Sequence, residues 1–95
     1  MIPKRDLNKA VELAKKYHIG KLYLVGSALH GDPQEANDYD FAVDEYPPDV
    51  FFSFYGELMR TMPKPVDLIN LSGRKMLFEK LVMRDGLLIY DAQRS

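Results

Sequence analysis

The sequence predicts an α/β fold: a mixed β-sheet of about four strands backed by helices, in the order α-β-α-β-α-β-α-β. Short apolar runs typical of strands alternate with longer segments whose apolar residues recur at helical spacing. The chain has 95 residues, of which 46% are hydrophobic and 28% are charged, as in an ordinary globular protein that buries one core. We therefore expect residues 1–95 to form a single domain.

The first half of the chain predicts one long helix followed by two strands. We expect a helix at residues 6–17, with Asp6 as its N-terminal cap and Gly20 at its end. Its inner face should carry Leu7, Ala10, Val11 and Ala14, with Leu13 at the edge. The segments that follow are a strand at residues 21–25, a short helical turn at 29–31, a loop at 32–37 and a second strand at 38–44.

The second half predicts two more helices and two more strands. Asp49 can cap a helix at residues 50–61, and residues 65–70 form a third strand. Ser72 can cap a last helix that runs to about residue 84 and ends at Gly86. We expect its inner face to carry Met76, Leu77, Leu81 and Val82. Residues 87–90 form a short last strand.

Charge and composition exclude several classes of function. The net charge of −1 provides no general basic field, so we expect no general nucleic-acid binding. The absence of cysteine excludes disulfides and Cys-based zinc sites. The first residues lack the apolar core of a signal peptide, and no apolar run is long enough to cross a bilayer. We therefore expect a cytoplasmic protein with no membrane partner.

Carboxylates at residues 38–44 and 67 form the first candidate site. Residues two apart in a strand point to the same face, so Asp38 and Asp40 share a face opposite the apolar residues Tyr39, Phe41 and Val43. Paired carboxylates with substrate phosphates are a typical Mg²⁺ site. Asp67 interrupts the third apolar strand, and it would complete the set if that strand lies beside the second. A single Asp-x-Asp is more often a solvated strand edge.

Gly26 and Ser27, at the end of the first strand, form the second candidate site. Glycine lets the backbone approach a ligand closely, and the amides that follow can face phosphate oxygens. The alternative is a serine that caps a strand-to-helix turn without any ligand.

These residues together resemble the minimal nucleotidyltransferases of the DNA polymerase β-like superfamily. The resemblance rests on Gly26-Ser27, ten intervening residues and Asp38-Tyr39-Asp40. It continues through Val66-Asp67-Leu68-Ile69 and residues 81–90, and so covers nearly the whole chain. The family implies Mg²⁺-dependent transfer of a nucleoside monophosphate, AMP from ATP, to an acceptor hydroxyl.

The resemblance also implies roles for individual residues. Gly26 and Ser27 would hold the triphosphate, and Asp38 and Asp40 would bind metal. Asp67 would complete the metal site and help to activate the acceptor hydroxyl. Stand-alone proteins of this size resemble the antitoxin of HEPN–minimal nucleotidyltransferase toxin–antitoxin pairs, which neutralises an RNase partner, in some cases by transferring AMP to its tyrosine.

Two positions depart from the family pattern. Family members commonly carry Arg directly after Gly-Ser and again two positions later, where this chain has Ala28 and His30. A protonated His30 would replace part of that charge near the nucleotide. Alternatives to the protein-modifying enzyme are a binding antitoxin without chemistry and a nucleotidyltransferase that acts on a small molecule. A glycosyltransferase is a further alternative, but it would leave Gly26-Ser27 unexplained.

The helix expected at residues 50–61 suggests a partner surface. It carries more aromatic residues than one face can bury, namely Phe51, Phe52, Phe54 and Tyr55. Either part of this set contacts a partner protein or the helix is buried on two sides.

Overall fold

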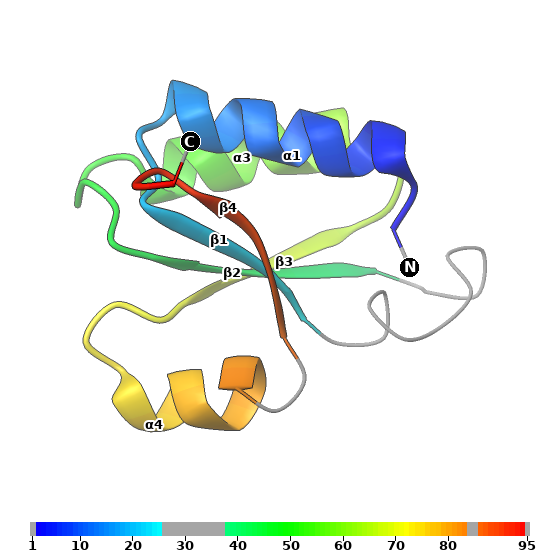
Figure 1. Cartoon of the computed structure of the whole chain (residues 1–95). Helices are drawn as coiled ribbons and strands as arrows, with labels where there is room; N and C mark the ends of the chain where they lie inside the picture. Colours follow the sequence, from blue (N-terminus) through cyan, green and yellow to red (C-terminus); the bar gives the residue numbers. More distant parts are fainter. Residues whose placement is uncertain (1, 26–37, 84–85, 95) are drawn as a thin grey trace.

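A computed structural model describes residues 2–25, 38–83 and 86–94 as a mixed sheet with helices on both faces (Figure 1). The elements are α1 (Lys4–Lys16), β1 (Lys21–Val25), β2 (Tyr39–Asp44), α3 (Phe51–Thr61), β3 (Val66–Asn70), α4 (Lys75–Phe78), the π-helical turn η1 (Glu79–Met83) and β4 (Leu87–Asp91). The predicted fold class is confirmed. The helical turn and loop expected at 29–37 lie outside the described residues.

The strands lie in the order β3-β2-β1-β4. Strand β1 pairs antiparallel with both β2 and β4, whereas β2 and β3 are parallel. Parallel neighbours need a crossover connection, and α3 provides it between β2 and β3. The third strand therefore lies beside the second, as the candidate site required.

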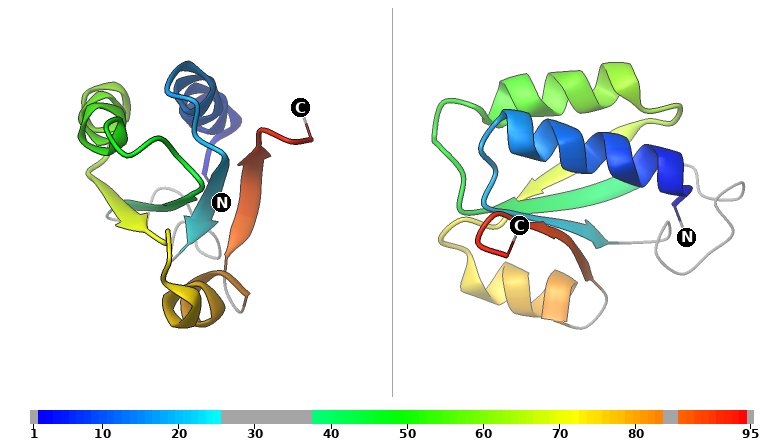
Figure 2. Two further views of the ribbon diagram at one scale, coloured as in Figure 1. Left: turned by 90° about the vertical axis from the view of Figure 1, so that its left-hand side faces the viewer. Right: turned by 45° about the horizontal axis from the view of Figure 1, so that its top comes forward.

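Helices α1 and α3 cover one face of the sheet (Figure 2). The larger hydrophobic core lies between these helices and the strands, and it contains the predicted inward residues of β2: Tyr39, Phe41 and Val43. Of the predicted inner face of α1, Ala10 and Ala14 are buried, and Leu7 and Leu13 pack against the core.

The predicted N-terminal caps are wrong. Helix α1 begins after Pro3, and Asp6 is a buried residue within its first turn. Asp6 lies four positions before the buried Ala10, so helical geometry turns the Asp6 side chain inward instead of back over the helix end. Val50 precedes α3 without a side-chain cap, so Asp49 does not cap that helix either.

The opposite face of the sheet is covered by α4 and η1 (Figure 1). A second, smaller core joins Tyr23, Val25, Ala42, Leu71 and Val82. Ala42 lies between Asp40 and Asp44 on this face and is fully buried, whereas the two aspartates are half-buried.

The predicted last helix is only partly correct. It begins at Lys75 after Arg74, not at a Ser72 cap, and it changes to a π-helix at Glu79. Met76, which we expected inside, is 85% exposed, whereas Leu77 and the neighbouring Phe78 pack against the smaller core. The wider π-helical turn changes the angle between successive side chains, so α-helical spacing does not identify the inner face of this segment.

Helix α3 cannot bury all of its aromatic residues. Phe54 and Leu58 are fully buried, and Tyr55 is half-buried, but Phe52 is 83% exposed and Met59 is 53% exposed. No helix in the described parts of the chain is long and apolar enough to cross a membrane.

Candidate active site

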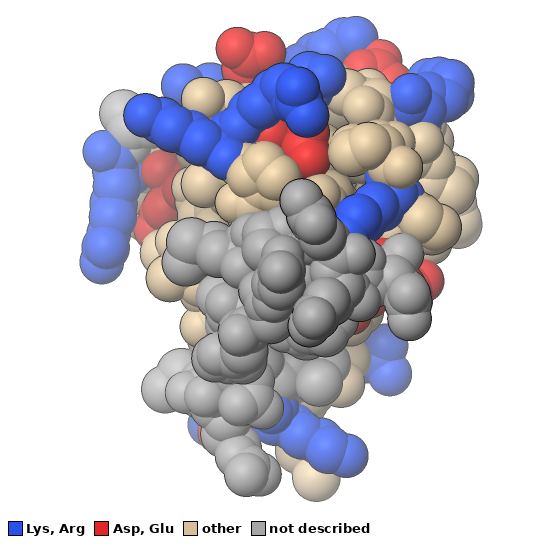
Figure 3. Space-filling view, turned by 90° about the vertical axis from the view of Figure 1, so that its right-hand side faces the viewer, with Lys and Arg blue, Asp and Glu red and all other residues tan. Residues whose placement is uncertain are grey.

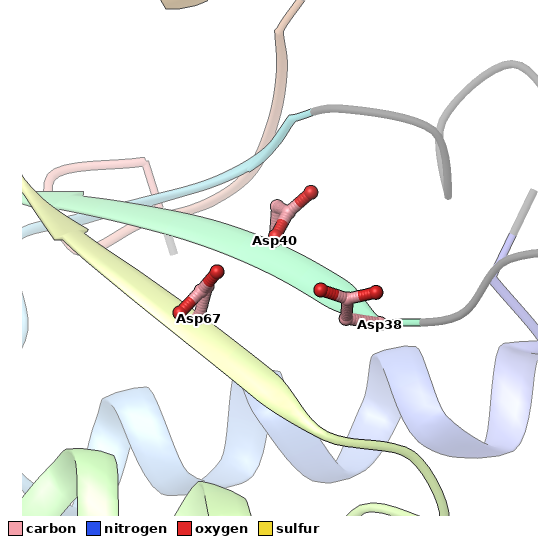
Figure 4. A group of neighbouring side chains, drawn as sticks. All are labelled: Asp38, Asp40 and Asp67. Atoms are coloured by element: carbon pink, nitrogen blue, oxygen red, sulfur yellow. The ribbon is translucent and has the colours of Figure 1, made fainter.

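The pairing of β2 with β3 brings the predicted carboxylates together. In the parallel register Asp40 lies opposite Asp67, and Tyr39 lies opposite Val66. Asp38 directly precedes β2 and reaches the same side (Figure 4). The three aspartates predicted from Asp-x-Asp and the third strand therefore form one cluster.

One carboxylate oxygen of each aspartate lies within 4.8 Å of the others. Two oxygens on opposite sides of one Mg²⁺ ion are about 4.2 Å apart, because each lies about 2.1 Å from the metal. Small side-chain rotations would therefore let all three carboxylates contact one ion. Oxygen ligands alone are the set that Mg²⁺ prefers, so the residues present fit this metal.

The cluster brings three negatively charged side chains close together. In the described ranges, the ion pairs involve Asp6, Glu45, Glu57 and Asp91, not the three clustered aspartates. Burial, and then the charges of Asp38 and Asp67, raise the pKa of Asp40. A divalent cation bound here would remove that repulsion.

Exposure differs among the three side chains. Asp38 and Asp40 are half-buried, whereas Asp67 is exposed. A molecule arriving from solvent can therefore reach Asp67 more readily than its neighbours.

Two tyrosine hydroxyls support the cluster from the helical side of the sheet. The Tyr39 hydroxyl donates a hydrogen bond to Oδ2 of Asp6 at 3.0 Å. The Tyr55 hydroxyl donates to the carbonyl oxygen of Val66 at 3.1 Å. Burial, together with the bond to Asp6, raises the pKa of Tyr39. Neither hydrogen bond is predicted by the sequence, although the position of Asp6 at inner-face helical spacing is a signal that its side chain is buried.

The remaining predicted site residues, Gly26, Ser27 and His30, lie outside the described residues. Arg74 and Lys75 line a cavity of about 490 Å³ at the Asp44 end of β2, together with Lys21 and Phe78. Neither is among the residues that form the carboxylate cluster.

The end of the molecule near the start of β2 carries side chains of both charges (Figure 3). On the end shown in Figure 3, Lys and Arg side chains gather over the helical layer, with Asp and Glu side chains between them. This mixture agrees with the net charge of −1.

The mixed sheet and its clustered carboxylates define the class as nucleotidyltransferase-like. The family model described as Polymerase beta, Nucleotidyltransferase matches residues 8–95, and the chain belongs to this family. No curated protein matches the chain significantly.

Solved structures of toxin–antitoxin complexes contain chains with the same fold. One, a toxin–antitoxin complex with AMP-PNP, is 25% identical with a TM-score of 0.72, and the match covers 93% of this chain and 75% of that chain. A second is the tri-AMPylated HEPN toxin of Shewanella oneidensis in complex with MNT antitoxin, at 21% identity and a TM-score of 0.69, covering 96% and 74%. A third is the toxin–antitoxin complex MntA–HepT, at 20% identity and a TM-score of 0.69, covering 97% and 75%.

Proposed function

We propose that this protein is a Mg²⁺-dependent nucleotidyltransferase that transfers AMP from ATP to a hydroxyl on a partner protein. The partner in this proposal is a HEPN toxin, which the transfer neutralises. The observation that carries the proposal is the cluster of Asp38, Asp40 and Asp67 in a chain of the polymerase β family. The AMPylated HEPN toxin with MNT antitoxin and the complex with AMP-PNP support the choice of nucleotide and acceptor.

In this proposal the three aspartates have different roles that follow from their positions. Asp38 and Asp40 hold the metal with the phosphates of ATP, and Asp67 completes the set. When bound, Mg²⁺ supplies positive charge that stabilises the phosphates during transfer. The exposed Asp67 lies where an acceptor hydroxyl can approach, and it takes the proton from that hydroxyl. The acceptor oxygen bonds to the α-phosphorus, the bond from that phosphorus to the bridging oxygen breaks, and pyrophosphate leaves.

In this proposal, nucleotide binding involves the residues that follow β1. Gly26 and Ser27 contact the triphosphate, as the family resemblance implies. His30 supplies a contact near it, at a position where the family commonly carries arginine. Because β1 and β2 pair with Val25 opposite Asp40, β1 ends beside the carboxylate cluster. A phosphate bound by Gly26 and Ser27 would therefore lie close to the aspartates.

The test is mass spectrometry of a co-expressed HEPN partner after incubation with ATP and Mg²⁺. We expect the wild-type protein to add AMP to the partner, and Asp38→Asn and Asp67→Asn to abolish the addition while they still bind the partner. Asp44→Asn is the matched control, because Asp44 lies on the same strand and face but outside the cluster. Loss of modification in this control as well would argue against a specific role for the cluster.

A binding antitoxin without chemistry is the second candidate. The observation that favours it is Ala28 and His30 at positions where the family commonly carries arginine. If the wild-type protein neutralises its partner but leaves it unmodified with every common triphosphate, this second function is the correct one.

The partner surface in this proposal lies on α3. Phe52 and Met59 are exposed and seven residues apart, so they lie on one side of the helix. We expect Phe52→Ser to weaken the complex by about tenfold or more, since buried aromatic anchors dominate interfaces. Met76→Ser on α4 removes an equally exposed apolar side chain and is the control. Equal effects of the two substitutions, measured by titration with the partner, would place the interface elsewhere.

A further inference from the structure

The carboxylate cluster is held from behind by two hydrogen bonds that meet at one position of the sheet. Tyr39 and Val66 are partners in the β2–β3 register, one residue before Asp40 and Asp67. The side chain of Tyr39 bonds to Asp6 of α1, and the carbonyl of Val66 accepts the bond from Tyr55 of α3. Each strand is therefore attached to the helical layer directly beside its aspartate.

The start of β2 has a further attachment to the segment before β3. The Tyr39 amide donates to the Pro65 carbonyl at 2.9 Å. Asp38 and Asp40 flank Tyr39, so the position of the Tyr39 backbone sets where both carboxylates begin. Mutual repulsion among three carboxylates would push the ends of these strands apart in the absence of metal.

Asp6 is an unusual residue for a structural core. It is 1% exposed, and it is the buried charged residue of the described core. Its position in the first turn of α1 places it at the positive end of the helix dipole. Arg5 provides a further cation, with Nε at 3.8 Å from Oδ1.

A buried ion is weak evidence for stability, because an apolar pair of similar size is often as stable or more so. A buried hydrogen-bonded pair instead fixes the rotamers of its two side chains and the position of the strand that carries one of them. The Tyr39 side chain is fully buried in the larger core, so its hydroxyl cannot exchange Asp6 for bulk water.

We propose that Asp6 and Tyr39 are a positioning pair for the metal site: their hydrogen bond holds the start of β2 so that Asp38 and Asp40 face Asp67 at metal-binding separation. This inference rests on the proposed function only in its use of the three aspartates as metal ligands. It adds two residues, one on α1 and one between the ligands, that act without touching the metal or the nucleotide.

Metal affinity measured without catalysis is the test, with Mn²⁺ as the probe and electron paramagnetic resonance as the readout. We expect Tyr39→Phe to weaken Mn²⁺ binding by roughly three- to tenfold. This loss is no larger than the loss seen when a group that is hydrogen-bonded directly to a metal ligand is removed. Tyr17→Phe is the matched control. Tyr17 also donates a hydroxyl hydrogen bond to a carboxylate, Glu57, but it does so between α1 and α3 and not beside a strand of the cluster.

Two further variants separate positioning from stability. Asp6→Asn keeps an acceptor oxygen for the Tyr39 hydroxyl, so we expect it to retain Mn²⁺ affinity within about twofold. The double variant Asp6→Ala with Tyr39→Phe leaves no unpaired buried carboxylate, so it should unfold at a higher denaturant concentration than Tyr39→Phe alone. Its Mn²⁺ affinity should remain as low as that of Tyr39→Phe. This double variant keeps the test decisive if Tyr39→Phe alone fails to fold.

Wild-type Mn²⁺ affinity in the folded double variant would overturn the proposal, as would equal losses in Tyr39→Phe and Tyr17→Phe. Absence of Mn²⁺ binding by the wild-type protein would overturn it too. The proposed function has a different point of failure. A wild-type protein that binds Mn²⁺ with the expected dependence on Asp6 and Tyr39, but modifies no partner, would refute AMP transfer and leave the positioning pair standing.

Discussion

The two faces of the sheet differ in how much apolar surface they bury and in what they leave exposed. The face under α1 and α3 is closed by these long helices, and the core between them contains Phe41 of β2 with Phe54 and Leu58 of α3, all fully buried. The other face is covered by α4, which is four residues long, and by the π-helical turn η1. Its core is smaller, and it does not include the carboxylates at the start of β2.

This difference separates stability from chemistry. Hydrophobic burial on the helical face stabilises the strands, and it can do so without constraining the residues on the other side because successive side chains alternate between faces. The start of β2 on the α4 side can therefore hold like charges close together. This arrangement is unfavourable for folding but suited to binding a cation.

The largest difference between the two faces should appear on truncation of their phenylalanines. We expect Phe41→Ala to lower the free energy of unfolding by about 3–5 kcal/mol, because it leaves a cavity in the closed core. Phe78→Ala, on the α4 side, should cost about 1–2 kcal/mol, since that ring is only half-buried and makes one edge contact with Tyr23. Denaturant titration of both variants measures this, and similar losses would show that the two cores contribute equally.

The metal-free carboxylate cluster should oppose folding. Since the pKa of Asp40 is raised in the folded protein, the folded state binds more protons than the unfolded state in the window just above the ordinary Asp pKa of 3.8. The contribution of Asp40 to the free energy of unfolding therefore falls as pH rises through that window. Asp40→Asn should be more stable than the wild-type protein at pH 7 without metal. We expect added Mg²⁺ to stabilise the wild-type protein but not Asp40→Asn.

Thermal melts with and without Mg²⁺, at pH 4 and pH 7, measure the effect. A lower melting temperature of Asp40→Asn at pH 7 without metal would contradict the repulsion inferred for this cluster. The Asp44→Asn variant again serves as the control on the same strand.

A smaller effect is expected where α1 meets α3. The Glu57 carboxylate accepts hydrogen bonds from Lys16 and Tyr17, and these two contacts lower the pKa of Glu57. Its contribution to stability is therefore present above its ordinary pKa of 4.5 and is lost as pH falls through the lowered value. We expect Glu57→Gln to reduce stability slightly at pH 7 and not at low pH. A loss that is independent of pH would assign the contact to packing instead of charge.

The smallest effect should come from Met76, on the outer side of α4. Because this side chain is 85% exposed, Met76→Ser should change the free energy of unfolding by less than about 0.5 kcal/mol. A loss of several times that amount in a denaturant titration would show that α4 packs in solution with a different face inward.

Local patterns in the sequence determined the helices and strands on the helical face and identified the three aspartates. Alternation in β2 separated Tyr39, Phe41 and Val43 from Asp38 and Asp40, and both sets lie on the predicted faces. This worked because the alternation of a strand and the spacing of an α-helix are properties of neighbouring residues alone.

Only the tertiary structure decided the rest. The meeting of Asp40 with Asp67 depends on a parallel register between strands that are separated by a whole helix, and spacing along the chain does not specify it. The hydrogen bond between Tyr39 and Asp6 joins residues that are 33 positions apart, so the partner of Asp6 is not specified locally. The inner face of α4 depends on a π-helical turn that local spacing does not reveal. Each of these features either joins residues distant in sequence or follows from backbone geometry imposed by packing. A local sequence pattern therefore cannot predict it.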